Sequence, residues 1–241
     1  MKISLIIPAY NEAPFIGACL DSIIAHSNGK LHEIIVVDNA STDDTAAIAA
    51  GKPGVRVVHE ARPGTGNARQ TGAEAATGDI LAYIDADTLM PAGWVEHVER
   101  AFADERVVFL SGPYRYRDSK RFPLWFLDGM WQIAGPIAQL LVGYVGNGGN
   151  TVVRRDALFK AGGIDRTIAF NGDDTDLARR MHSVGKTKWR NGFTIYTSAR
   201  RFDEEGLRLY ATYFFNYWWI VLFHRPFTKG VRYLRTQKKT E

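Results

Sequence analysis

The sequence predicts an α/β protein, a doubly wound, mixed but mostly parallel sheet with helices on both faces, in a single compact domain. Short runs rich in β-branched residues alternate with segments of helical spacing, which is the pattern of strand–helix–strand units. The first run, residues 2–8, is almost continuously apolar, as expected for a strand that helices cover on both faces. A chain of 241 residues with 46% hydrophobic and 23% charged residues can bury the core of one such domain.

Five strands are expected in the first half of the chain. Three of them are the apolar runs EIIVVD, VRVVH and ILAYID, whose β-branched residues favour strands. Between the runs, apolar or small residues recur at helical spacing. The expected strands span residues 2–8, 33–38, 55–59, 80–85 and 107–112. The expected helices span 13–26, a segment that Ser41 or Thr42 caps, 66–76 and a segment that starts at Pro91.

The second half of the chain is less regular. Residues 122–145 are apolar, but Asp128, Pro136 and several glycines interrupt them. The aromatic run 207–223 predicts a C-terminal helical segment. Further strands are expected at 150–153 and 193–197 and a helix at 173–184, and no repeat or Gly/Ser linker divides the chain.

The net charge of +4 is unevenly distributed. Residues 1–178 carry 16 basic and 22 acidic side chains, a net charge of −6, whereas residues 179–241 carry 14 basic and 4 acidic ones, a net charge of +10. A basic segment can contact nucleic acid, anionic lipid or a phosphate-bearing substrate, or it can form a solvated surface. We expect no nucleic acid as partner, because no nucleic-acid-binding motif accompanies the charge.

The single cysteine, Cys19, excludes an internal disulfide framework and suits a reducing cytoplasm. Its apolar neighbours predict a buried core residue rather than a nucleophile. The short apolar run at the N-terminus predicts a strand rather than a signal peptide. The expected localisation is therefore cytoplasmic.

Acidic side chains follow the predicted strands at their carboxyl ends, where open parallel sheets bind ligands. Asp85 and Asp87 lie two residues apart after an apolar strand. Their carboxylates repel each other unless a cation or donor lies between them, and a hard divalent ion takes such oxygen ligands. The ion would stabilise a departing diphosphate as a Lewis acid. The alternative is a pair of turn-capping aspartates.

Asp38 and Arg69 are candidates for contacts with a nucleotide. Asp38 ends a buried strand, and its carboxylate could accept from the imide N–H of a base such as uracil, or could close an Asx turn. Arg69 follows a Gly-rich turn and offers a planar set of donors to a base or phosphate. The alternative is that this segment serves only to pack the helix against its neighbours.

A third acidic group, Gly172-Asp173-Asp174-Thr175-Asp176, opens a predicted helix. Acidic residues at a helix N-terminus are favoured by the helix dipole, so simple capping is one interpretation. The other is a general base whose pKa neighbouring acids raise towards neutrality. Asp174 is the preferred base and Asp173 is the second choice.

Arg200 and Arg201 follow the strand expected at 193–197. They could hold a diphosphate or an acceptor phosphate, or lie on the surface.

Six segments form an ordered set: SLIIPAYNE (4–12), VVDNASTD (36–43), GNARQTG (66–72), YIDADT (83–88), GGN (148–150) and GDDTDL (172–177). In this order they resemble the family 2 glycosyltransferases of the GT-A fold, which are usually inverting enzymes. The resemblance covers roughly residues 2–185. It implies transfer of a sugar from a UDP- or GDP-sugar to an acceptor hydroxyl or phosphate.

The resemblance also implies roles for individual residues. It implies that Asp87 is the main ligand of Mn²⁺ or Mg²⁺, that Asp85 faces ribose or metal, and that Asp174 is the base. Residues 1–112 would form the nucleotide-sugar half and 113–206 the acceptor and base half of the domain. The residues implied to contact the nucleotide sugar are Pro8, Ala9, Tyr10, Glu12, Asp38, Arg69, Asp85 and Ala86.

Two departures from the family pattern matter. The family often has Glu-Asp where this chain has Asp173-Asp174, so the choice of base stays open between the two. The Gln-x-x-Arg-Trp signature of processive synthases is missing, and Lys186-Thr187-Lys188-Trp189 is the nearest match. A non-processive enzyme is therefore expected.

The segment 207–241 predicts a contact with the cytoplasmic face of a membrane. Its first 17 residues contain Arg208 and Asn216 and are too short and polar for a span, which needs about 20 apolar residues. Aromatic side chains followed by a basic stretch suit an interfacial helix on an anionic leaflet. The alternative is a core helix with a solvated tail. Residues 122–145 could likewise shape a groove for a lipid-linked acceptor in cell-envelope glycan synthesis.

The main alternative function is a catalytically inactive glycosyltransferase-like module that binds a nucleotide sugar or a membrane. Retention of the acids at 38, 85, 87 and 173–176 argues against it.

Overall fold

The computed structural model describes residues 1–168, 172–206 and 208–223. Within them, seven strands form one sheet: β1 (Ile3–Ala9), β2 (Glu33–Asp38), β3 (Val55–His59), β4 (Ile80–Ile84), β5 (Val107–Ser111), β7 (Asn150–Arg154) and β8 (Lys186–Trp189). Their order is β3-β2-β1-β4-β7-β5-β8, and neighbours run parallel except at β7, which is antiparallel to β4 and β5. The predicted mixed, mostly parallel sheet is confirmed.

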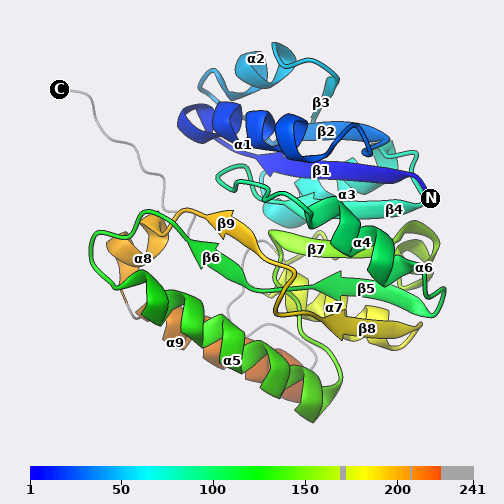
Figure 1. Cartoon of the computed structure of the whole chain (residues 1–241), viewed down its shortest axis with the longest axis vertical. Coiled ribbons are helices and arrows are strands. Elements are labelled where there is room, and N and C mark those ends of the chain that lie inside the picture. Colours follow the sequence, from blue (N-terminus) through cyan, green and yellow to red (C-terminus); the bar gives the residue numbers. More distant parts are fainter. Residues whose placement is uncertain (169–171, 207, 224–241) are drawn as a thin grey trace.

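Helices cover both faces of this sheet (Figure 1). One face carries α1 (Ala13–His26), α2 (Thr45–Ala50) and α4 (Trp94–Phe102), and the other carries α3 (Thr65–Ala75), α6 (Arg155–Lys160) and α7 (Asp173–His182).

The two core layers follow from the alternation of side chains along a strand. In β1, Leu5 and Ile7 belong to the cluster under α1, and Ile6 belongs to the cluster under α3. Gly72 lets α3 approach the sheet closely, because a Cβ there would lie 2.3 Å from Cγ2 of Ile6.

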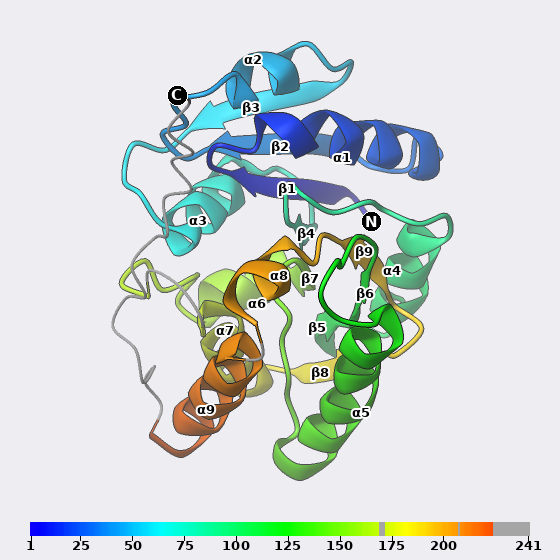
Figure 2. The same cartoon turned by 90° about the vertical axis from the view of Figure 1, so that its left-hand side faces the viewer.

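A second group of elements lies beside the sheet (Figures 1 and 2). It contains a short parallel pair, β6 (Tyr114–Tyr116) and β9 (Ile195–Thr197), and the helices α5 (Leu124–Val142), α8 (Arg200–Glu205) and α9 (Arg208–Phe223). The predicted C-terminal aromatic helix is therefore present from residue 208 to 223, and residues 224–241 of that prediction lie outside the described residues. None of the described helices is both long and apolar enough to cross a bilayer.

Pro136 does not break α5, although the sequence suggested an interruption there. A proline inside a helix cannot donate to the carbonyl four residues earlier. Here that carbonyl belongs to Gln132, and Nδ2 of Asn191 donates to it at 3.0 Å. A partner distant in sequence thus satisfies the carbonyl that the proline leaves unpaired.

Candidate active site

A cavity of about 650 Å³ lies at the carboxyl ends of β1, β2 and β4. Loops from these strands form one wall, as expected for an open α/β sheet. The start of α7, the start of α8 and the helices α5 and α9 complete it. The charged residues that line it are Glu12, Arg69, Asp85, Asp87, Asp173, Asp174, Arg200 and Arg201.

Asp85 is held by two partners at the end of β4. Its Oδ1 accepts from Nη2 of Arg69 at 3.1 Å, and its Oδ2 accepts from the hydroxyl of Tyr114 at 3.2 Å. Gly149 must lack a side chain, because a Cβ there would lie 2.1 Å from Oδ2 of Asp85.

Asp87 faces a guanidinium group. Nη2 of Arg200 lies 3.1 Å from Oδ2 of Asp87 and donates to Oε1 of Glu12 at 2.6 Å. The same guanidinium lies 4.5 Å from the ring centre of Phe15. Burial raises the pKa of Asp87, and the charge of Arg200 acts in the opposite direction. Glu12, for which the resemblance implied a contact with the nucleotide, lines the cavity and contacts Arg200.

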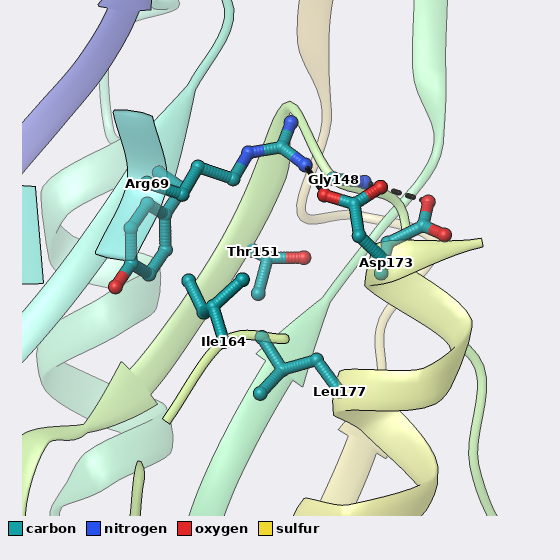
Figure 3. A pocket seen from close by; sticks show the side chains of 8 residues that line it. Arg69, Gly148, Thr151, Ile164, Asp173 and Leu177 are labelled. Atoms are coloured by element: carbon teal, nitrogen blue, oxygen red, sulfur yellow. Dashed lines mark hydrogen bonds and ion pairs between the residues drawn. The ribbon is translucent and has the colours of Figure 1, made fainter. Parts of the chain in front are cut away.

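Arg69 connects three parts of the site. Besides Asp85, its Nη1 donates to Oδ2 of Asp173 at the start of α7. Figure 3 shows the guanidinium extending past Gly148 towards Asp173, with Ile164 and Leu177 closing the space beneath. Burial alone would lower the pKa of Arg69, but the two carboxylates outweigh it and raise the pKa. Arg69 is thus a buried cation between two acids.

Asp174 is held mainly by backbone N–H groups. Gly148 donates to its Oδ2 at 3.1 Å and Thr175 donates to its Oδ1 at 2.7 Å. Burial and, next, the charge of Asp173 raise its pKa to about 6. Such a carboxyl group is ionised at neutral pH and basic enough to take a proton.

The residues that the resemblance assigned to the nucleotide sugar line this cavity, with one exception. Pro8, Ala9 and Tyr10 lie on the wall, and Ala86 lies between the two aspartates. Asp38 is not among the lining residues, and its neighbour Asn39 is.

The carboxylate of Asp38 is turned towards its own loop and the end of β3. Oδ1 accepts from the N–H of Ser41 at 3.3 Å, and Oδ2 lies 3.1 Å from Nδ1 of His59. The structure thus shows a local contact of Asp38 with its own loop, and the contact of this carboxylate with a nucleotide base stays a prediction.

The sequence did not predict Tyr114 or Tyr213 as residues of the site; Tyr213 was expected only as an aromatic residue of the C-terminal helix. Tyr114 accepts from the N–H of Gly149 at 2.8 Å and donates to Asp85, and Tyr213 of α9 hydrogen-bonds with Arg201. Both tyrosines lie in segments without a periodic signal that points to a ligand. The sequence did single out the segment GGN (148–150). The structure explains its two glycines, because a Cβ at Gly148 would lie 2.7 Å from Nη1 of Arg69 and a Cβ at Gly149 would meet Asp85.

Comparisons with known proteins agree with this geometry. Residues 4–160, more than half of the chain, match the model of the family described as Glycosyl transferase family 2. The uncharacterized glycosyltransferase YibD of Escherichia coli (strain K12) is 40% identical over 90 residues, which are 36% of this chain and 26% of that protein. Glucosyl-3-phosphoglycerate synthase of Mycolicibacterium paratuberculosis is 39% identical over 97 residues, 37% of this chain and 29% of that protein. These matches span about a quarter to a third of the relatives' length.

Two solved structures share the fold. The mannosyltransferase PcManGT from Pyrobaculum calidifontis, in complex with GDP-Man and Mn²⁺, has a TM-score of 0.62 and 26% identity, over 81% of this chain and 56% of that chain. Glucosyl-3-phosphoglycerate synthase from Mycobacterium tuberculosis, in complex with Mn²⁺, UDP and phosphoglyceric acid, has a TM-score of 0.66 and 25% identity, over 92% of this chain and 77% of that chain. The sheet is the GT-A fold, and the chain belongs to glycosyl transferase family 2.

Proposed function

We propose that the chain transfers a sugar from a UDP- or GDP-sugar to an acceptor hydroxyl or phosphate, with inversion at the anomeric carbon and without processive synthesis. The observation that carries this proposal is that Asp85, Asp87 and Asp174 line one cavity, although they come from distant segments. Residues 1–112 would bind the donor, and residues 113–206 would supply the acceptor wall and the base.

The metal in this proposal is Mn²⁺ or Mg²⁺, held by Asp87 and Asp85. Among the described residues, no three His, Cys, Asp or Glu side chains gather to hold a metal by themselves. Two carboxylates still suit such an ion, because Mg²⁺ is commonly bound by one or two carboxylates together with substrate phosphates. Asp87 already faces a cation, the guanidinium of Arg200. When bound, the ion would stabilise the negative charge of the departing diphosphate.

Asp174 is the proposed base, and two features favour it over Asp173. Asp173 is buried against Arg69, which holds its carboxylate, whereas Asp174 is held mainly by N–H groups. A raised pKa of about 6 also suits proton removal from an acceptor hydroxyl near neutral pH.

Pro8, Ala9, Tyr10 and Ala86 are proposed to line the donor, with Asp38 at its edge. Arg200 and Arg201 are proposed to contact the diphosphate or an acceptor phosphate, because both line the same cavity and guanidinium groups bind phosphate oxygens in pairs. Arg200 would exchange its contact with Asp87 for the phosphate.

A lipid-linked acceptor and a contact with the cytoplasmic face of a membrane complete the proposal. Large apolar side chains of α9, including Phe215, Leu222 and Phe223, are exposed. The sequence beyond α9, residues 224–241, contains six Lys or Arg and one Glu, which suits an anionic surface.

The test is the product of the reaction. UDP- and GDP-sugars of known anomeric configuration are offered with Mn²⁺ and acceptors, and the configuration of the new bond is determined by NMR. Inversion is expected, and retention would exclude Asp174 as the base of a single displacement. Binding of donors without any release of nucleoside diphosphate would favour the inactive module.

A further inference from the structure

Two consecutive N–H groups of one turn contact different parts of the active site. The turn spans residues 147–150, and the N–H of its last residue donates to the carbonyl of its first at 2.8 Å. The N–H of Gly148 donates to Oδ2 of Asp174 at 3.1 Å, and the N–H of Gly149 donates to the hydroxyl of Tyr114 at 2.8 Å. Figure 3 marks the first of these hydrogen bonds with a dashed line at Gly148. The turn thus connects the proposed base to a tyrosine of β6.

The turn has no room for side chains at its centre. A Cβ on Gly148 would lie 2.7 Å from Nη1 of Arg69, and a Cβ on Gly149 would lie 2.1 Å from Oδ2 of Asp85. The backbone groups of the turn must therefore set its position. A buried N–H without a partner costs free energy, so the hydroxyl of Tyr114 favours one position of Gly149.

The hydroxyl of Tyr114 is oriented by Asp85. It donates its one proton to Oδ2 of Asp85 at 3.2 Å, which leaves its lone pairs to accept from the N–H of Gly149. Asp85 is itself held at Oδ1 by Nη2 of Arg69. A row of contacts therefore leads from Arg69 and Asp85, through one hydroxyl, to the turn that holds the base.

The ring of Tyr114 makes a separate, structural contribution. It packs edge-on against Tyr116, with the ring centres 6.2 Å apart, and it contacts the core under α1. A phenylalanine at position 114 would keep this packing and remove only the hydroxyl. The two contributions can therefore be separated by experiment.

We infer that Tyr114 is a positioning residue for the base, because its hydroxyl fixes the turn whose Gly148 N–H holds the carboxylate of Asp174. The inference deepens the proposed function and rests on it in one respect, that Asp174 takes the proton of the acceptor.

The first measurement needs no turnover. In a chain labelled with ¹³C at the aspartate carboxyl groups, NMR titration follows the pKa of Asp174, which is raised to about 6 in the native chain, and D174N assigns the signal. In Y114F the Gly148 N–H is held less firmly at this carboxylate. Loss of a hydrogen bond to the charged form should raise the pKa by about half a unit or more. An unchanged pKa would overturn the inference.

Three other titratable groups interact with Asp174. Asp173 precedes it on α7, Arg69 approaches it from α3, and Tyr213 approaches it from α9. Y114F keeps all three side chains, so a shift in this variant reports the position of the turn.

Tyr116 supplies the matched control. It lies two residues further along β6, and its hydroxyl accepts from Nε1 of Trp131 on α5 at 3.2 Å. Y116F therefore removes a hydroxyl from the same strand and should leave the pKa of Asp174 unchanged. Equal shifts in Y114F and Y116F would point to a general loosening of β6 and would overturn the inference.

Kinetics distinguish a role towards the base from a role towards Asp85. At pH 8 the base is ionised in both proteins, so the displaced base of Y114F should lower kcat by about tenfold or more. The affinity for UDP or GDP with Mn²⁺ should change less than about threefold, because Arg69 still holds Asp85. Weaker nucleotide binding with an unchanged kcat would assign the hydroxyl to Asp85 alone and contradict the inference.

The two readouts separate this inference from the proposed function. A raised pKa in Y114F, in a chain that transfers no sugar in its native form, would support the fixed turn and contradict the proposed function. Sugar transfer by the native chain with an unshifted pKa in Y114F would support the function and contradict the inference.

Discussion

At the scale of single residues, the charges in the cavity are arranged in groups. Arg69 lies between Asp85 and Asp173, and Arg200 lies between Glu12 and Asp87. The carboxylate of Asp174 instead accepts hydrogen bonds from two backbone N–H groups, and its pKa is raised to about 6. Because the other four carboxylates contact arginines, Asp174 is the one that we expect to exchange a proton most readily.

Replacement of the proposed base gives the first prediction. Asp174→Asn should lower the rate of transfer at least a hundredfold, because general base catalysis typically contributes about 10²–10⁴-fold. Donor affinity, measured by calorimetry, should change little. Normal transfer in this variant would move the role of base to Asp173.

The pH dependence of transfer gives the second prediction. The base must be ionised, so kcat/KM should fall about tenfold per pH unit below the pKa of about 6 and be level above it. Asp173→Asn removes a negative neighbour that raises this pKa and also leaves the charge of Arg69 less neutralised. Both changes lower the pKa of Asp174, so the acid limb should move to lower pH. A shift to higher pH would contradict this arrangement.

The metal ligand gives the third prediction. Asp87→Ala should remove the dependence of UDP or GDP binding on Mn²⁺, which calorimetry with and without the ion measures. Asp21→Ala is the control, because that carboxylate is exposed and pairs with Lys52 away from the cavity. Equal Mn²⁺ dependence in the Asp87 variant would exclude this residue as the main ligand.

At the scale of elements, the sequence predicted the helices and strands whose residue pattern lies within the element itself. The strands at 33–38 and 55–59 and the helix at 13–26 have the observed bounds. The short elements β6, β8, α6 and α8 were missed, because three to six residues carry too little periodicity and their positions depend on distant partners. The helix across Pro136 likewise depends on Asn191, which sequence pattern alone does not reveal.

Packing of α5 gives the fourth prediction, with a control in the same helix. Gly135→Ala should destabilise the fold by about 1–3 kcal/mol, because the added methyl group meets the ring of Trp189. Gly129→Ala meets no atom within 4 Å and should stabilise the helix by up to about 1 kcal/mol. Urea unfolding measures both, and equal effects of the two changes would contradict the tight packing.

At the scale of the whole molecule, the topology brings the candidate residues together. The sequence placed Asp85 and Asp87 at the end of a parallel strand, and sheets of this kind bind ligands there. It could not show that Asp38 would turn towards Ser41, or that Glu12 would pair with Arg200, because both depend on how loops fold against each other. The sequence thus predicted where the candidate site lies, but it did not predict which of its side chains contact each other.

Membrane contact gives the fifth prediction. The full chain should sediment with anionic vesicles at low salt, and deletion of residues 224–241 should weaken this, because six basic side chains are lost. Raising the ionic strength should also weaken binding, since salt screens surface charge. Unchanged sedimentation of the truncated chain would leave no membrane role for this basic segment.

The most direct test of sugar-nucleotide chemistry in this cavity is thermal unfolding with UDP, GDP and their sugars, with and without Mn²⁺. A ligand that binds only the folded state at a hundred times its Kd stabilises it by about 2.7 kcal/mol. We predict stabilisation by at least one nucleoside diphosphate that requires Mn²⁺ or Mg²⁺ in the native chain, persists in Asp174→Asn and is lost in Asp87→Ala. If none of the nucleotides stabilises a chain that unfolds cooperatively, this result contradicts sugar-nucleotide chemistry in the cavity.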